Sequence, residues 1–301
     1  MSILPTKQIA GVRYFGSFPG TAVGETPIVL IHSPGSSLDF WNAVAPALRR
    51  HRRTVALDLP GFGGTGPPSG SLDLSALSTG VATLLDAIGV RNALVVGFSG
   101  GGAVALQVAA DRPDLVRGVA LLSGCLFSAR RIVEQPWRSL TNPRLAFALG
   151  MLTIESLIPI AEVTKQALLR SKTVRALLFS SFVARPARLN ADLVVDAVSY
   201  VNALYTARLV RVMLSSRGTR IENLMRAVRQ PAALIWGADD PLMTTVDAAR
   251  AEELLNVVLR TELADCGHWP MFEQPEQVVG SLIRYARQLE RPGDAVRSHV
   301  G

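Results

Sequence analysis

The longest stretch without a charged residue runs from Asn92 to Ala110. So many apolar residues cannot all face water, and the stretch must lie in a protein core or in a membrane. A membrane helix is disfavoured, because Ser99 stands at its centre among glycines 97 and 100–102. The residues before the serine predict a buried strand, 93–98, and those after it predict a helix. The core is therefore expected to form around a strand, a sharp turn and a helix.

The same alternation of apolar strand and helical pattern occurs on both sides of this unit. Short apolar runs of the kind found in buried parallel strands lie at 28–32 and 54–57, and further strands are predicted at 118–122, 232–236 and 257–263. Helical spacing of apolar residues is found at 41–50, 72–88, 245–255 and 275–289. This order predicts an α/β fold, a doubly wound and mostly parallel sheet with helices on both faces.

The alternation stops for about a hundred residues after position 125. Residues 126–228 show no clear strand and are expected to form several helices, with prolines at 136, 143, 159 and 186 as breaks. With 301 residues, the chain is long enough for one large domain and an insertion. We predict a core domain from residues 1–125 and 229–301, and a helical cap, or lid, from residues 126–228.

The positive charge is concentrated in this predicted cap. The chain has a net charge of +7, yet residues 126–228 hold 15 Lys and Arg against 6 Asp and Glu, so the remainder is slightly acidic. Because these basic residues alternate with Leu, Val and Ala, they fit the solvated faces of amphipathic helices. No nucleic-acid partner is predicted. An acidic substrate or contact with an anionic membrane surface is the alternative explanation.

Cysteine and histidine are too few to suggest a metal site. The chain has two cysteines and four histidines, without the spacing of metal ligands or of a disulfide framework. Its first residues carry Lys7 and Arg13 and lack the apolar run of a signal peptide. We expect neither a metal nor a cofactor, and a cytoplasmic location.

The turn after the central strand carries a candidate nucleophile. Residues 97–101 match G-x-S-x-G between a strand and a helix, the context of a nucleophile elbow, whereas a phosphate-binding loop would need a different glycine pattern. A serine hydroxyl reacts only if a base removes its proton, and the base needs a carboxylate to fix its tautomer. His268 follows the last predicted strand, and Asp239 and Asp240 follow the strand that ends at Trp236. All three loops are expected at the carboxyl edge of the sheet.

With these motifs the chain resembles the α/β-hydrolase superfamily, in the branch with a helical cap, over nearly its whole length. Residues 58–63 are similar to its D-x-P-G-x-G loop, and residues 267–270 with 273–276 are similar to its G-H-W-P…E-Q-P-E segment. The resemblance implies the α/β-hydrolase fold and a catalytic triad of Ser99, Asp240 and His268. Asp240 is preferred over Asp239 because the family's acid stands three residues after a glycine, here Gly237. A serine nucleophile argues against dehalogenases and epoxide hydrolases.

The loop after the first predicted buried strand departs from the family pattern. The family has His-Gly and then a residue whose backbone N–H forms half of an oxyanion hole, whereas this chain has His32-Ser33-Pro34-Gly35. Aligned without a gap, the donor position is Pro34, which has no N–H. With a one-residue gap the donor is Ser33, and we predict an oxyanion hole of Ser33 and Gly100. Both alignments stay open.

The resemblance implies a serine hydrolase of the carboxylic ester type that acts through an acyl-enzyme. The apolar cap favours a hydrophobic small-molecule substrate, namely a small or medium ester, lactone or thioester. Candidates for lining its pocket are His32, Pro34, Phe98 and Trp269. A C–C bond hydrolase or a cofactor-free perhydrolase would use the same triad. An incomplete oxyanion hole would instead fit a cyclase, a lyase or a ligand-binding module.

Overall fold

The fold is described from a computed structural model of the chain. It describes residues 4–17, 24–124, 162–200, 202–215 and 220–291, together with Phe127, Arg131, Glu134, Gln135 and Trp137. Most of the first third of the predicted cap, and residues 292–301, therefore lie outside the described residues.

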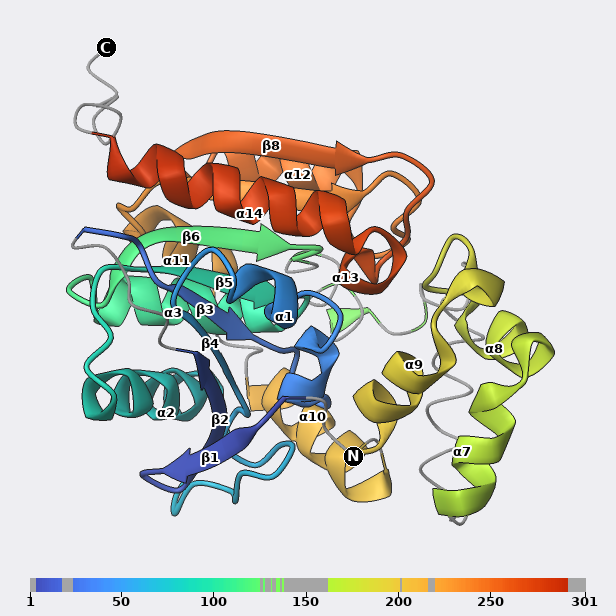
Figure 1. The fold of residues 1–301 in the computed structure, drawn as a ribbon. Coiled ribbons are helices and arrows are strands. Elements are labelled where there is room, and N and C mark those ends of the chain that lie inside the picture. Colours follow the sequence, from blue (N-terminus) through green and yellow to red (C-terminus); the bar gives the residue numbers. More distant parts are fainter. Residues whose placement is uncertain are drawn as a thin grey trace.

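An eight-stranded sheet organises the described part of the chain (Figure 1). Its strands are β1 (Thr6–Ile9), β2 (Val12–Ser17), β3 (Ile28–Ile31), β4 (Thr54–Leu57), β5 (Ala93–Phe98), β6 (Val116–Leu122), β7 (Ala232–Gly237) and β8 (Val257–Leu263). Their order across the sheet is β1-β2-β4-β3-β5-β6-β7-β8. From β4 to β8 all pairs are parallel, whereas β2 pairs antiparallel with β4, and β1 with β2. The predicted mostly parallel sheet is confirmed.

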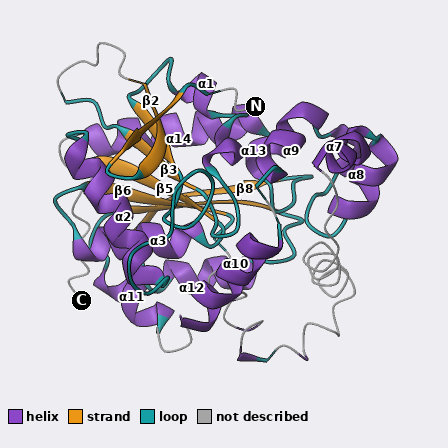
Figure 2. Ribbon diagram, turned by 90° about the horizontal axis from the view of Figure 1, so that it is seen from below, coloured by secondary structure: helices purple, strands orange, loops and turns teal. Residues whose placement is uncertain are grey.

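Helices cover both faces of the sheet (Figure 2). On one face pack α2 (Leu74–Ala87), α3 (Gly101–Asp111), α11 (Ile221–Ala227) and α12 (Thr245–Glu252). On the other pack α1 (Ala45–Leu48) and α14 (Pro275–Glu290). Each face of the sheet has its own apolar core, and successive strand residues point into opposite cores. In β3, Val29 and Ile31 lie in the core under α2 and α3, whereas Ile28 and Leu30 lie in the core under α14. Because both faces are buried, the parallel strands consist of apolar residues almost throughout.

The amino-terminal half differs from the prediction in two places. The hairpin β1–β2 was not predicted, because β1 lies at the sheet edge and its four residues are exposed. The single helix predicted over 41–50 is wrong. A short 3₁₀ helix (η1, Leu38–Trp41) comes first, and α1 begins only at Ala45. Pro46 explains the break, because proline lacks an N–H and its ring clashes with the carbonyl four residues earlier.

Several helices lie between β6 and β7, and all of them except α11 lie beyond the carboxyl ends of the strands (Figure 1). They are α7 (Glu162–Arg170), α8 (Lys172–Phe179), η2 (Pro186–Arg188), α9 (Ala191–Val198), α10 (Ala203–Ser215) and the already named α11. On α10, the Tyr205 hydroxyl donates to the carbonyl of Gly63 over 2.6 Å, and Arg208 donates to the carbonyl of Gly61 over 2.6 Å. These bonds hold α10 on the loop after β4. The boundaries predicted for a separate cap domain stay a prediction.

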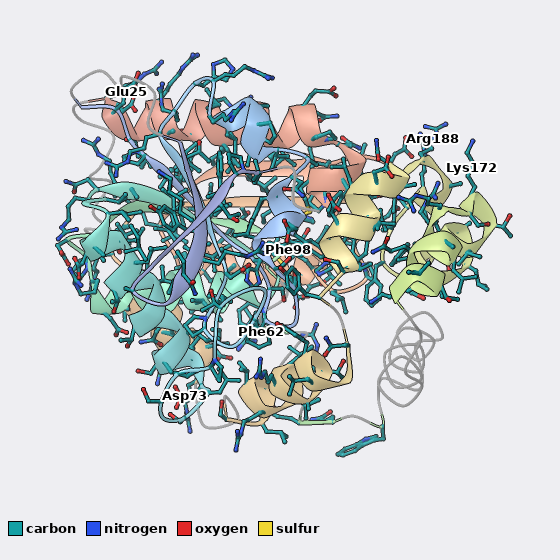
Figure 3. The ribbon with its side chains drawn as sticks, turned by 60° about the horizontal axis from the view of Figure 1, so that its bottom comes forward. Glu25, Phe62, Asp73, Phe98, Lys172 and Arg188 are labelled. Carbon is teal, nitrogen blue, oxygen red and sulfur yellow. The ribbon has the colours of Figure 1, made fainter. Side chains whose placement is uncertain are left out.

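The basic side chains of these helices have more than one environment. Arg170 and Arg185 are about half exposed and form surface ion pairs with Asp192 and Asp265. Figure 3 places Lys172 and Arg188 on the outer side of these helices, far from Phe98. Arg175 differs, since it is buried and donates to the carbonyls of residues 169 and 170. Solvated faces therefore account for several of these residues but not for Arg175.

Two features are absent from the described part of the chain, a membrane span and a metal-binding cluster. Among the described residues, no helix combines the length and the apolar character needed to span a bilayer. The same residues contain no group of three or more His, Cys, Asp and Glu side chains arranged to hold a metal ion.

Candidate active site

Ser99 sits on a strained turn between β5 and α3. Its φ is +51°, a left-handed conformation that is unfavourable for a residue with a side chain. Glycines on both sides permit the tight turn, because a Cβ on Gly97 would collide with the backbone of Gly101, and one on Gly101 would lie 2.5 Å from the carbonyl oxygen of His32. The Ser99 N–H donates to the carbonyl of Leu122 over 3.0 Å. The turn presents the serine at the carboxyl end of β5 and at the start of α3.

The structure brings Ser99, His268 and Asp240 into one hydrogen-bonded chain. The distance from His268 Nε2 to Ser99 Oγ is 3.0 Å. The other ring nitrogen, Nδ1, lies 3.0 Å from Asp240 Oδ1 and 2.9 Å from Asp240 Oδ2. The three residues are only 7%, 4% and 5% exposed, in that order. Low water access strengthens the electrostatic interaction between the carboxylate and the imidazole.

The loop after β7 selects Asp240 over its neighbour. Asp240 Oδ1 accepts hydrogen bonds from the N–H groups of Leu242 and Met243 over 2.8 and 3.0 Å, which fix the carboxylate towards His268. Asp239 is exposed. A Cβ on Gly237 would collide with the carbonyls of Cys266 and Gly267, so only glycine lets the acid loop approach the histidine loop this closely.

The histidine loop is tied to the segment between α8 and η2. The His268 N–H donates to the carbonyl of Phe182 over 2.6 Å. Glu273 accepts hydrogen bonds from the N–H groups of Gly267 and Trp269 in the histidine loop, and from the N–H of Ala184 over 2.9 Å. Burial raises the pKa of the Glu273 carboxyl, although these backbone donors act in the opposite direction. Glu273 thus positions His268 and joins two segments far apart in the chain.

Replacing Glu273 by glutamine should loosen this loop. The NH₂ group of a glutamine would face backbone N–H groups that now donate to the Glu273 carboxylate. At least one backbone N–H would therefore lose its acceptor, at a cost of about 1–3 kcal/mol in the free energy of unfolding. A shift of His268 by a fraction of an ångström should lower kcat by about 10- to 100-fold. Chemical denaturation and steady-state kinetics measure the two effects. The matched control is Glu276→Gln on the exposed start of α14, which should leave kcat unchanged. Equal activity of both variants would contradict the positioning role.

Aromatic rings surround the imidazole. The ring centroids of Phe98 and Phe182 lie 5.4 and 6.3 Å from that of His268. Phe98 stacks on Phe40 at 5.6 Å, and Trp269 lies 5.4 Å from Phe40 and 4.8 Å from Phe179. These rings come from β5, η1, α8, the segment between α8 and η2, and the histidine loop, and they make the surroundings of Ser99 apolar. Figure 3 shows Phe98 at the centre of the molecule, between the sheet and α9.

The loop after β3 lies against the serine turn. His32 is fully buried, its Nδ1 contacts the carbonyl of Ser33 at 2.8 Å, and its Nε2 accepts from the N–H of Leu59 over 2.9 Å. Nδ1 therefore carries the proton, and burial lowers the pKa of this imidazole below its usual 6.5. His32 orders the loop. A Cβ on Gly100 would lie 3.1 Å from Pro34 Cδ and 3.2 Å from Ser33 Oγ, so both residues face the turn after Ser99.

Sequence reasoning found the three residues of the hydrogen-bonded chain and missed some of their neighbours. Ser33, Pro34, Gly100, Phe98 and Trp269 also lie around Ser99 and His268. Phe40, Phe179, Phe182 and the positioning role of Glu273 were missed. Glu273 had a signal in the E-Q-P-E motif, whereas nothing in the sequence places Phe182 beside His268.

The chain is similar to known proteins over most of its length. A family model described as alpha/beta hydrolase fold matches residues 26–275. The dihydrolipoyllysine-residue acetyltransferase component of the acetoin cleaving system of Pseudomonas putida is 28% identical over 288 residues, covering 94% of this chain and 70% of that protein. The 2-hydroxy-6-oxo-2,4-heptadienoate hydrolase of Pseudomonas putida is 27% identical, covering 82% of this chain and 84% of that protein. A solved membrane phospholipase A, a bacterial virulence factor, has a TM-score of 0.70 at 22% identity, covering 95% of this chain and 86% of that one.

Proposed function

Because the chain belongs to the alpha/beta hydrolase fold family, we propose that it is a serine hydrolase whose catalytic triad is Ser99, His268 and Asp240. The observation that carries the proposal is the hydrogen-bonded chain from Ser99 Oγ through the imidazole to the Asp240 carboxylate. It is supported by the left-handed turn at Ser99, since backbone strain of this kind is stored at functional sites.

His268 activates the nucleophile in this mechanism. Its Nε2 takes the proton of Ser99 as Oγ attacks the substrate carbonyl, and Asp240 stabilises the imidazolium that forms. The carbonyl π electrons move onto oxygen and give a tetrahedral intermediate. When this intermediate collapses, His268 returns the proton to the leaving group, and an acyl-enzyme remains. Water then attacks the acyl carbon with the same histidine as base.

The start of α3 stabilises the oxyanion. The N–H of Gly100 belongs to the first turn after the nucleophile, where free N–H groups and the helix dipole favour negative charge. Gly100 has no side chain, and a Cβ at this position would lie 3.1 Å from Pro34 Cδ and 3.2 Å from Ser33 Oγ. The loop after β3 therefore lies close to the residue that carries this N–H.

The aromatic surroundings of His268 favour an apolar substrate. Phe98, Phe182 and the cluster of Phe40, Phe179 and Trp269 offer apolar surface next to the reacting atoms. Sites for small molecules are mainly apolar, with few polar groups that orient the ligand. We infer that the substrate is a hydrophobic ester, lactone or thioester of small or medium size.

A carbon–carbon bond hydrolase is the second candidate. It is favoured by the similarity to the hydrolase of 2-hydroxy-6-oxo-2,4-heptadienoate, which spans most of both chains. The same nucleophile and base would act on a ketone carbonyl, and the leaving group would be a stabilised carbanion that His268 protonates. This candidate predicts turnover of a vinylogous diketone with negligible esterase activity.

A labelling experiment with two substrate panels tests the proposal. The full chain is incubated with a fluorophosphonate and digested, and the modified residue is located by mass spectrometry. We expect the label on Ser99, together with hydrolysis of p-nitrophenyl acyl esters. Turnover of a 6-oxo-dienoate alone would favour the second candidate. If Ser99 is not labelled and no substrate is turned over, both candidates are contradicted.

A further inference from the structure

We propose that the Ser33 hydroxyl is a catalytic donor that completes the oxyanion hole, in place of the backbone N–H that Pro34 cannot supply. This proposal rests on the proposed function and assigns a further residue to it. It moves the donor from the backbone of Ser33, which the sequence predicted, to its side chain.

The proposed mechanism needs a second donor opposite Gly100. One N–H alone leaves an oxyanion short of a hydrogen bond, and the loss of one such donor lowers the rate by about 10²- to 10³-fold. The loop after β3 is the segment that approaches Gly100, and the residues it brings there are Ser33 and Pro34. The imide nitrogen of Pro34 bears Cδ instead of a hydrogen. Since Cδ is the Pro34 atom that comes nearest to the Cβ position of Gly100, at 3.1 Å, carbon occupies the place where an N–H would point.

The Ser33 carbonyl has its own partners in the loop. It accepts from His32 Nδ1 over 2.8 Å and from the N–H of Ser36 over 3.1 Å. His32 is fixed in turn by the N–H of Leu59, and α10 covers the loop, because a Cβ on Gly35 would lie 3.2 Å from Leu209 Cδ2. The peptide between Ser33 and Pro34 is therefore held in one orientation.

The Ser33 hydroxyl is a side-chain donor of this loop that lies beside Gly100. Its Oγ lies 3.2 Å from the Cβ position of Gly100. Its contact with the carbonyl of Pro34 is 3.4 Å long, which is beyond the usual range for a hydroxyl donor. Ser33 is also partly exposed, whereas His32 and Pro34 on either side are buried. A rotatable hydroxyl at this place can turn its hydrogen towards an oxyanion bound at the Gly100 N–H.

No atom of Ser33 is transferred in the reaction. As Ser99 Oγ bonds to the carbonyl carbon, the π electron pair moves to oxygen and the Ser99 proton goes to His268. Ser33 then donates a hydrogen bond to the negative oxygen and keeps its proton. When the carbonyl reforms, the leaving group departs with the proton from His268.

Three variants of the 301-residue chain test this role, with p-nitrophenyl ester hydrolysis and fluorophosphonate labelling as readouts. Ser33→Ala removes the hydroxyl but keeps the backbone N–H, and should lower kcat by about 10²- to 10³-fold with little change in KM. Ser33→Thr keeps a hydroxyl and should retain most of the activity. The double variant S33A/P34A restores an N–H at position 34, and should recover activity relative to Ser33→Ala.

Ser36→Ala is the matched control, because it removes a hydroxyl from the same loop, and it should behave like the parent. Parental activity of Ser33→Ala would overturn the inference and leave the proposed function standing, with the Ser33 N–H as donor. A loss in Ser33→Ala that neither the threonine nor the double variant relieves would also overturn it, since a purely structural role predicts that result. If the parent neither labels at Ser99 nor turns over any substrate, the proposed function itself fails.

Discussion

Replacing Ser99 by alanine should lower kcat by about 10⁵- to 10⁶-fold, the loss expected when the nucleophile of a triad is removed. In the proposed mechanism the Ser99 oxygen forms the acyl-enzyme, and an alanine side chain has no atom that could replace it. KM should change little, because the aromatic side chains that we propose to bind the substrate remain. Initial rates on a p-nitrophenyl ester and titration with a fluorophosphonate measure the effect.

Ser123→Ala is the matched control for this experiment. Ser123 is also a buried serine with a positive φ, +48°, and it follows β6 as Ser99 follows β5. Its removal should leave labelling at Ser99 intact. If Ser99→Ala kept more than a few per cent of parental activity while Ser123→Ala did not, the nucleophile would be wrongly assigned.

Burial explains why most strands could be predicted from the sequence. β4, β5 and β8 have the predicted bounds, and β3, β6 and β7 differ from them by one or two residues at an end. Parallel strands with helices on both faces must be apolar throughout, so they stand out as short uncharged runs. β8 is the exception, because most of its residues are only partly buried and it contains the exposed Arg260 and Glu262.

The amino-terminal hairpin shows what such a pattern misses. β1 is short, polar and exposed, so no apolar run marks it. The sequence signals for the hairpin are Gly11 and the alternating apolar residues Val12 and Tyr14, which share one face of β2. In the structure Ala10 and Gly11 form the turn, and both have positive φ. Two-residue turns of this kind join antiparallel strands because their twist matches that of the strands.

The candidate site was predictable where chemistry limits the choice and unpredictable where packing decides. Ser99, Asp240 and His268 follow from motifs placed at strand ends. The contact of Phe182 with the histidine loop depends on how the helices between β6 and β7 fold back, and no spacing in the chain encodes it. Likewise, the position of the Ser33 hydroxyl and the Pro34 ring against Gly100 follows from the folded structure and from no motif in the sequence.

Replacing Asp240 by asparagine should lower kcat by roughly 10⁴-fold while the fold stays intact. Asp240 Oδ1 accepts two backbone N–H groups, so the amide oxygen of an asparagine must take the same position. Its NH₂ group then replaces Oδ2, which faces His268 Nδ1 at 2.9 Å. Nδ1 must accept from this NH₂ group, and the imidazole proton moves to Nε2. Nε2 points at Ser99 Oγ and can no longer accept the serine proton.

The neighbouring carboxylate provides the control, because Asp239→Asn changes the same charge by the same chemistry on an exposed side chain. Asp239→Asn should keep the parental kcat and the parental rate of fluorophosphonate labelling, whereas Asp240→Asn should lower both in parallel. KM and the melting temperature of Asp240→Asn should stay close to those of the parent, since the two backbone bonds to the side chain remain. An equal loss in both variants would mean that the net negative charge of the loop matters, and not the tautomer of His268. That result would refute the geometric role assigned to Asp240.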